Sequence, residues 1–291
     1  NLRPIRVWLK ELVEGHIDFD YRKQLTQHHS STHLINAAAK KVLGNHINQA
    51  GAKKTLEKAH IDITHYQSLT REELDHIEQE ANTLIKSCIP IHKSFIERTQ
   101  AEKEYGVGIY QGGVVPGKKL RIVNIVGVDV EACGGTHLNN TSEAELIKII
   151  KASKIADGIV RLEFVAGAKA KEYQKQEGTL LDEVTALLGV KPAEITLASE
   201  RLFNLWKIAG KQLKKLQDPP YLEQVKKGNQ VLEPLMYVPL KSTSKSSLDV
   251  EELLRETAVL LKTQPEHLVK TLQRFKNELE QYKKEIEKKL K

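Results

Sequence analysis

Two short motifs in this chain place metal-binding side chains at the same spacing. His29 is followed four residues later by His33, and Cys133 is followed four residues later by His137. Side chains at this spacing on a helix lie on one face, so a single ion can contact both members of a pair. Three imidazoles and one thiolate form a donor set that suits zinc. The sequence therefore predicts a Zn²⁺ site with the ligands His29, His33, Cys133 and His137.

The donor set leaves the kind of metal site open. Ser30 follows His29, whereas the metalloprotease helix motif requires a glutamate there as general base, so a peptidase is excluded. Structural zinc sites are usually richer in cysteine, so three histidines with one cysteine favour an exchangeable or catalytic ion. However, four protein ligands fill a tetrahedron and leave no position for water. His28 is a weaker candidate ligand than His29, because Thr32 occupies its partner position.

Composition and charge limit the class of protein. The 291 residues are enough for about two domains, and a hydrophobic content of 40% allows a sizeable core. The net charge of +7 favours an anionic partner, most commonly nucleic acid, although lysine-rich helices can equally serve solubility. Two cysteines give no disulfide framework, which agrees with a cytoplasmic location. No apolar run approaches the roughly 20 residues of a membrane span, so no membrane partner is expected.

Residues 1–167 are predicted to form an α+β domain, with helices packed on an antiparallel or mixed sheet. Apolar residues at helical spacing predict a helix from Leu25 to Leu43, which contains the first histidine pair. Thr70 and Glu73 form a capping box at the start of a second helix. Alternating or β-branched runs predict strands near 61–63, 89–96, 120–130, 146–150 and 159–165.

Residues 168–291 are predicted to form an all-α helical domain with an internal repeat. Residues 183–215 and 256–288 align at a constant offset of 73. Apolar residues in the second copy recur at intervals of four and three, as in the seam of a helical hairpin or coiled coil. This seam serves either packing between the two copies or a homodimer. An insert at 217–247 separates the copies and includes a flexible loop rich in serine and lysine.

Several segments appear in the order found in one protein family. They are His29-Ser-Ser-Thr-His33-Leu34, Asn48-Gln-Ala-Gly51, Leu56–Tyr66, Tyr110-Gln-Gly-Gly113 and Cys133-Gly-Gly-Thr-His137-Leu138. Together they resemble the editing domain of alanyl-tRNA synthetase, most closely its archaeal form, over residues 12–167. The helical remainder resembles, less specifically, the region that leads toward dimerisation in these synthetases. The tandem copy and its insert depart from that pattern.

The resemblance implies a hydrolase that removes serine or glycine from mischarged tRNA(Ala), with Zn²⁺ as its cofactor and tRNA(Ala) as its partner. The two predicted pairs would supply the zinc ligands, and Thr32 and Gln49 match the positions that sense the amino acid. A pocket built to hydrogen-bond a hydroxyl rejects an analogue that lacks it, which supports such roles. Alternatively, Thr32 bonds a backbone carbonyl and Gln49 caps a loop.

Other residues near the motifs have less defined roles. Glu131 is the nearest carboxylate to Cys133 and serves either the reaction or the positioning of a ligand. Gly134 and Gly135 let backbone N–H groups approach an ester oxygen, or simply make the turn. The general base stays open, and the terminal ribose of the tRNA can supply it. Candidate contacts to tRNA phosphates, each alternatively a solvated surface residue, are Lys40, Lys41, Lys53, Lys54 and Arg161.

The leading interpretation is an editing hydrolase within an alanyl-tRNA synthetase, whose ligase domain lies outside this chain. The chain starts at Asn1 and its only methionine is Met236, so we expect a fragment. Residues 1–11 are then the remnant of a preceding β-barrel. Two alternatives are a free-standing trans-editing protein and a non-catalytic tRNA-binding module with a structural zinc.

Overall fold

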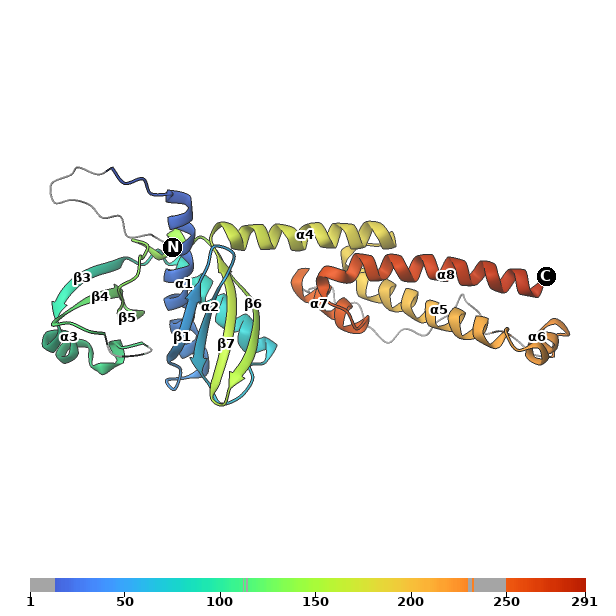
Figure 1. Cartoon of the computed structure of the whole chain (residues 1–291), viewed down its shortest axis with the longest axis horizontal. Coiled ribbons are helices and arrows are strands. Elements are labelled where there is room, and N and C mark those ends of the chain that lie inside the picture. The colour runs from blue at the N-terminus through green and yellow to red at the C-terminus, as the bar shows by residue number, and fades with distance from the viewer. Residues whose placement is uncertain (1–13, 112, 114, 230–231, 233–249) are drawn as a thin grey trace. The chain divides into compact units, whose positions relative to one another are not determined.

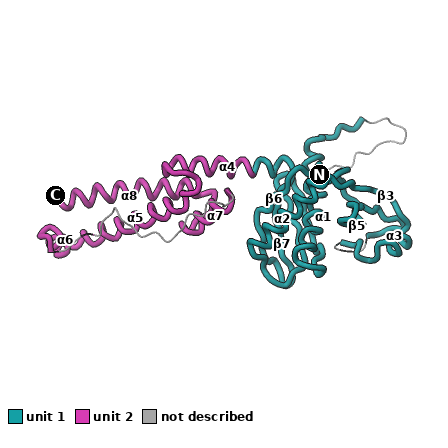
Figure 2. The backbone as a smooth tube through the Cα atoms, turned by 180° about the vertical axis from the view of Figure 1, so that it is seen from behind, with its two compact units in different colours: residues 1–173 teal, residues 174–291 magenta. Residues whose placement is uncertain are grey.

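The computed structural model describes residues 14–111, 113, 115–229, 232 and 250–291 (Figure 1). The expected barrel remnant at 1–11 and the serine-rich loop at 242–247 lie outside the described residues. The chain divides into two compact units, residues 1–173 and residues 174–291 (Figure 2). The first unit contains both metal-binding motifs, and the second contains both copies of the helical repeat.

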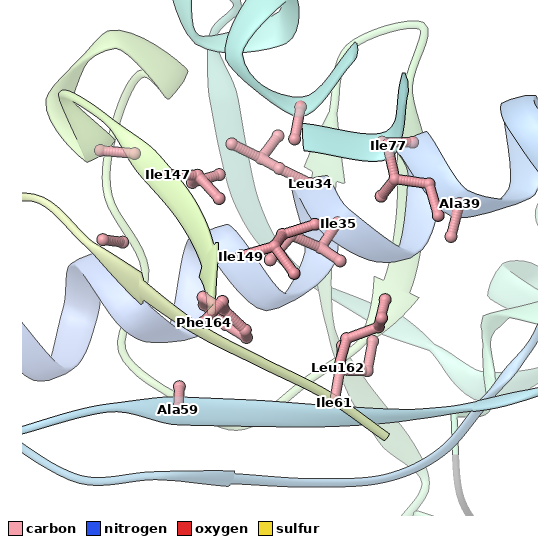
Figure 3. Packing of buried hydrophobic residues seen from close by; sticks show 14 of the residues in the cluster. Leu34, Ile35, Ala39, Ala59, Ile61, Ile77, Ile147, Ile149, Leu162 and Phe164 are labelled. Carbon is pink, nitrogen blue, oxygen red and sulfur yellow. The ribbon is translucent and has the colours of Figure 1, made fainter. Parts of the chain in front are cut away.

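The larger sheet of the first unit is antiparallel and has the strand order β1-β2-β7-β6. Its strands are β1 (Gln49–Lys54), β2 (Ala59–Thr64), β6 (Ile147–Ala156) and β7 (Ile159–Ala166). Two helices, α1 (Phe19–Leu43) and α2 (Arg71–Lys86), pack against each other and against this sheet. Leu34 of α1, Ile77 of α2, and Ile61 and Leu162 of the sheet belong to one hydrophobic core (Figure 3). Helices packed on antiparallel sheets confirm the predicted α+β class.

Helix α1 buries an unusually polar surface. It begins at Phe19, before the predicted start at Leu25, because Asp18 caps it by accepting a hydrogen bond from the Tyr21 N–H at 3.0 Å. Most of its buried side chains are polar, among them His33 of the first motif and the neighbouring His28. Buried polar groups require hydrogen-bond partners, so this face is organised around specific contacts in addition to apolar packing. The capping box predicted for α2 at Thr70 is confirmed.

A second antiparallel sheet, with the order β3-β4-β5, carries the cysteine motif. Its strands are β3 (Ile91–Glu97), β4 (Lys119–Ile125) and β5 (Asp129–Ala132), and α3 (Arg98–Tyr105) follows β3. The prediction of one strand over 120–130 is wrong, because β4 and β5 form a hairpin. Gly127 in the turn has a φ of 72°, a left-handed conformation that interrupts an extended run. Cys133 therefore follows a short strand at the edge of this sheet.

The second unit is helical, as predicted, and contains α5 (Ile195–Lys215), α6 (Pro219–Lys226), α7 (Val250–Leu260) and α8 (Leu268–Leu290). Helix α4 (Ala168–Leu188) crosses the boundary between the units. The long helices of the two repeats, α5 and α8, run parallel and pack on each other (Figure 1). The Trp206 ring lies 4.5 Å from that of Phe275, and the Trp206 indole N–H donates to Glu278 at 2.6 Å. The predicted seam thus joins the two copies within the chain.

None of the helices in the described part of the chain combines the length and apolar composition needed to cross a bilayer.

We predict that Gly167→Ala destabilises the first unit more than Gly158→Ala does. Both glycines have left-handed φ values, 63° and 70°, so alanine is strained at either position by roughly 1 kcal/mol. Only at Gly167 would a Cβ collide, at 1.9 Å, with Oε1 of Gln27. Displacing this buried amide breaks its hydrogen bond to the Glu143 carbonyl, which costs about 1–3 kcal/mol more.

Chemical unfolding of the two variants and the parent measures this difference in the free energy of unfolding. Equal losses for the two variants would contradict the assigned collision.

Candidate metal centre

The four predicted ligands meet between α1 and the loop that follows β5. The Nε2 atoms of His29 and His137 lie 3.2 and 3.3 Å from the Cys133 Sγ. The ring of His137 lies 4.4 Å from that of His29 and 4.7 Å from that of His33. One donor atom from each of the four residues lies within 4.8 Å of the others, so this cluster could hold a metal ion. Helix spacing supplies one pair, and the tertiary fold brings the second pair to it.

At Cys133, His29 and His137 the charges are already those of a metal-binding site. Burial raises the pKa of the Cys133 thiol, but hydrogen bonds from His137, His29 and His33 outweigh this effect and lower it to about 2. Burial lowers the pKa of His137 to about 4 and lowers that of His29 as well. A thiolate beside neutral imidazoles is the form in which these side chains bind a metal.

His33 differs from the other histidines because two carboxylates hold its far nitrogen. Its Nδ1 lies 2.9 Å from Oε2 of Glu131 and 3.1 Å from Oδ2 of Asp129. Burial lowers the pKa of His33, but its bonds to Asp129, Cys133 and Glu131 outweigh burial and raise it well above its usual range. A carboxylate on the second ring nitrogen fixes the orientation of a metal-binding histidine. Nε2 of His33 is thereby directed toward Cys133.

Strand geometry explains how β5 delivers these groups together. Successive side chains of a strand alternate between its faces, so Asp129, Glu131 and Cys133 share one face. Among them, sequence analysis identified Glu131 and Cys133 but missed Asp129. The acidic residue two positions before Glu131 was the available signal, since alternation predicts that both carboxylates reach the same neighbour.

Ser30 contacts His137, the last of the four candidate ligands. The sequence patterns did not identify Ser30 as a site residue. Its hydroxyl oxygen accepts the Leu138 N–H at 3.0 Å and lies 3.2 Å from Nδ1 of His137, to which its proton is then directed. The serine that stands in place of a peptidase glutamate thus orients a candidate ligand. His28 turns away from the centre, with Nδ1 2.8 Å from the Thr55 carbonyl and Nε2 3.1 Å from the Gln24 amide.

The two glycines of the cysteine motif differ in what they require. A Cβ at Gly135 would lie 1.9 Å from Cε1 of His29, so no side chain fits there while the imidazole keeps its place. A Cβ at Gly134 would meet nothing within 4 Å. Arg121 of β4 fixes the turn by donating to the carbonyls of Cys133 and Gly135, both at 2.7 Å. Sequence patterns gave no signal for Arg121.

The two residues predicted to sense an amino acid lie in different environments. Thr32 is fully buried, and its hydroxyl donates to the His28 carbonyl at 2.9 Å, the structural alternative considered for it. Gln49 is partly exposed at the start of β1. Its backbone N–H donates to Oε1 of Gln111 at 3.0 Å, which joins two of the quoted motifs.

The predicted phosphate contacts are spread over the first unit. Lys54 is half-buried, and this burial lowers its pKa. The negative charges of Cys133 and Glu131 raise the pKa in part, which shows that Lys54 lies within electrostatic reach of the centre. Lys53 is exposed on the other face of β1. Lys40 and Lys41 lie in the last turn of α1, and Lys41 forms an ion pair with Glu80. Arg161 of β7 forms a two-point ion pair with Asp62, with N–O distances of 2.7 and 2.9 Å.

The donor chemistry of the centre fits a zinc ion. A thiolate and imidazoles are zinc's usual ligands, and both His33 and His137 have a hydrogen-bond partner on the nitrogen that faces away from the cluster. A second group of residues that could hold a metal ion consists of His33, Asp129 and Glu131, and it shares His33 with the four-residue cluster. We therefore treat the two groups as one centre with supporting carboxylates.

Comparisons with known proteins place this site in a family. Residues 120–163, which include the cysteine motif, match the threonyl and alanyl tRNA synthetase second additional domain. The chain is 50% identical over 205 residues to the alanine–tRNA ligase of Methanocella arvoryzae, a match that covers 70% of this chain and 23% of that relative.

Two further relatives agree with this result. They are the alanine–tRNA ligases of Methanococcus maripaludis, 44% identical over 208 residues, and Halorubrum lacusprofundi, 41% identical over 209 residues. These matches cover 71% and 72% of this chain, but only 23% and 22% of the relatives. The chain is thus a homologue of one segment of the archaeal alanine–tRNA ligases, and it carries the second additional domain that threonyl and alanyl synthetases share.

Proposed function

We propose that this chain is the editing part of an alanyl-tRNA synthetase and hydrolyses the ester of tRNA(Ala) mischarged with serine or glycine. The observation that carries the proposal is the convergence of His29, His33, Cys133 and His137 on one point. The last two of these lie within the segment that matches the synthetase additional domain. A zinc ion held there would polarise the ester carbonyl or lower the pKa of a water molecule.

The residues around the proposed zinc ion would prepare the site for ester cleavage. Glu131 and Asp129 hold His33 in place, so the ligand does not have to reorganise during the reaction. Among the described residues, the N–H groups of Gly134 and Gly135 have no hydrogen-bond acceptor. They are therefore available to a negatively charged oxygen that forms when the carbonyl is attacked.

Discrimination against alanine would depend on a polar group for the hydroxyl of serine. The Thr32 proton is committed to the His28 carbonyl, so its oxygen remains as an acceptor. Gln49 is partly exposed and is the more accessible of the two in this conformation. Alanine offers no hydroxyl to either group, so both residues would favour serine in the hydrolytic site.

One observation favours a second function. Four protein donors can complete a tetrahedral zinc site, which would give a closed structural centre in a tRNA-binding module without catalysis. Catalysis then requires one donor to move or the ion to accept a fifth ligand. The experiments below separate the two functions.

We predict that the purified chain releases serine from seryl-tRNA(Ala) and leaves alanyl-tRNA(Ala) largely intact. Removing the serine-sensing groups by Gln49→Ala or Thr32→Val should narrow this preference by about tenfold, the worth of one hydrogen bond. Deacylation of labelled aminoacyl-tRNA, with both substrates followed in parallel, measures the preference. A folded, zinc-loaded parent that releases no serine would favour the non-catalytic module.

We predict that the parent binds one equivalent of zinc and that Cys133→Ser binds it far more weakly. The thiolate is the one soft ligand of the set, and a serine hydroxyl does not ionise at neutral pH. Cys88→Ser is the matched control, because Cys88 is exposed and lies outside the cluster. Elemental analysis and competition with a chromogenic chelator measure the stoichiometry and affinity; equal zinc contents in the two variants would refute the assigned ligand set.

We predict that Glu131→Gln weakens zinc binding about 10- to 100-fold without removing a ligand. The neutral amide no longer stabilises the His33 ring in the orientation that presents Nε2 to the ion. Chelator competition gives the affinity, and circular dichroism verifies the fold of the variant. Unchanged affinity would mean that Asp129 alone orients His33.

A further inference from the structure

Lys54 ends the edge strand β1, and its side chain lies on the face of the sheet that α1 covers. Lys54 is opposite Ala59 of β2, and Ala52 is opposite Ile61. Directly opposite residues of an antiparallel pair point to the same face of the sheet. Ala59 and Ile61 are buried in the core to which Leu34 of α1 also belongs, so Lys54 points toward α1.

The end of β1 is held against α1 at the position of the metal cluster. Nδ1 of His28 lies 2.8 Å from the carbonyl oxygen of Thr55, the residue after Lys54. His29, the next residue of α1, is one of the four candidate ligands. Burial lowers the pKa of His29, a hydrogen bond with Cys133 opposes this effect, and the positive charge of Lys54 lowers the pKa further. Lys54 therefore approaches the cluster from the side of β1.

The ammonium of Lys54 is half-buried, yet in the described part of the chain it has no hydrogen-bond or ion-pair partner. Burying a cation costs free energy unless an opposite charge compensates for the lost water. A second cation, Arg121, approaches the cysteine loop but donates to the carbonyls of Cys133 and Gly135. Of these two cations, Lys54 is thus the one that remains available to a negatively charged ligand.

We infer that Lys54 is a catalytic residue whose ammonium binds the carbonyl oxygen of the ester, an inference that rests on the proposed editing function. Water adds to the carbonyl carbon, and the π electron pair of the C=O bond moves to this oxygen. Lys54 stays protonated and stabilises the new negative charge. When the C=O bond forms again, the bond to the ribose oxygen breaks, and this oxygen takes one proton of the water. The other proton passes to solvent, and serine leaves as a free amino acid with an ionised carboxylate.

Two features favour the ester oxygen over an RNA phosphate as the partner of Lys54. The side chain points toward α1 and its buried histidines, whereas the neighbouring Lys53 is exposed on the other face of β1. Burial lowers the pKa of Lys54, and the charges of Cys133 and Glu131 raise it in part, so its charge acts at the centre. A charge that is in place before the reaction needs no reorganisation when the carbonyl oxygen becomes negative.

The test compares Lys54→Met and Lys54→Arg with the control Lys86→Met, each as the full chain. Methionine keeps a long apolar side chain but removes the charge, and arginine keeps the charge. Lys86 is exposed at the end of α2 and lies outside the metal cluster, so Lys86→Met removes a charge of the same sign far from the ligands. Circular dichroism verifies the fold of every variant.

Three readouts are followed, and two of them need no hydrolysis. The first is kcat and KM of the zinc-loaded proteins for seryl-tRNA(Ala) and for serine methyl ester, which carries no phosphate. The second is zinc affinity, measured by competition with a chelator. The third is the Kd, measured by calorimetry, of the methyl phosphonate analogue of the serine ester, which is a stable tetrahedral anion, and of the neutral serinamide.

We expect Lys54→Met to lower kcat about 100-fold for both seryl-tRNA(Ala) and serine methyl ester, as for the loss of one donor to the developing charge. The Kd of the phosphonate should rise by about the same factor, and that of serinamide should stay unchanged. Zinc affinity should increase by up to about tenfold, because a positive charge beside a doubly charged cation is removed. Lys54→Arg should lose less activity than Lys54→Met and keep the zinc affinity of the parent.

Two results would overturn the inference. A loss of activity confined to seryl-tRNA(Ala) would assign Lys54 to a phosphate of the RNA, and a zinc affinity equal to that of Lys86→Met would place its charge away from the centre. A parent protein that cleaves neither ester would refute the proposed editing function instead. The zinc and phosphonate measurements would still decide whether Lys54 acts at the metal centre.

Discussion

The structure of the first unit depends on a buried polar contact between α1 and the loop after β5. A thiolate, three imidazoles and two carboxylates meet there with most of their surface removed from water. Such groups are costly to bury unless each finds a partner, so the fold must satisfy them mutually. The pairing of Glu131 with His33, and of Ser30 with His137, shows how this is done. An ion shared by the cluster would complete the same arrangement.

This constraint explains features that lie outside the ligand set. Gly135 is needed because His29 occupies the space of its side chain, and Arg121 ties the resulting turn to β4. Gln27, on the same helix, fills the space beside Gly167 where β7 gives way to α4. The polar side of α1 is therefore fitted closely to several loops, while its apolar side joins the hydrophobic core with Leu34 and its neighbours. One helix thus supplies both the packing and the chemistry.

The helical unit follows a different principle, in which a repeated sequence packs on itself. Trp206 meets Phe275, and a Cβ at Gly210 would lie 3.3 Å from the ring of Tyr282, so α5 and α8 pack side by side in the same direction. Parallel pairing follows from the repeat, because two similar apolar stripes in the same direction match along their length. The seam needs no second molecule to become buried.

The sequence by itself indicated the four residues that could hold a metal, the α+β and helical classes, and the internal seam, because these depend on spacing along one helix or strand. Only the tertiary structure showed that residues 120–130 turn back as a hairpin, that Asp129 joins Glu131 on His33, and that Ser30 holds His137. It also placed Phe19 and Arg22 of α1 in a cleft that His137 helps to line. These facts depend on which distant segments approach each other. Alternation along β5 places Asp129 on the same face as Glu131, but it does not identify His33 as the partner of both.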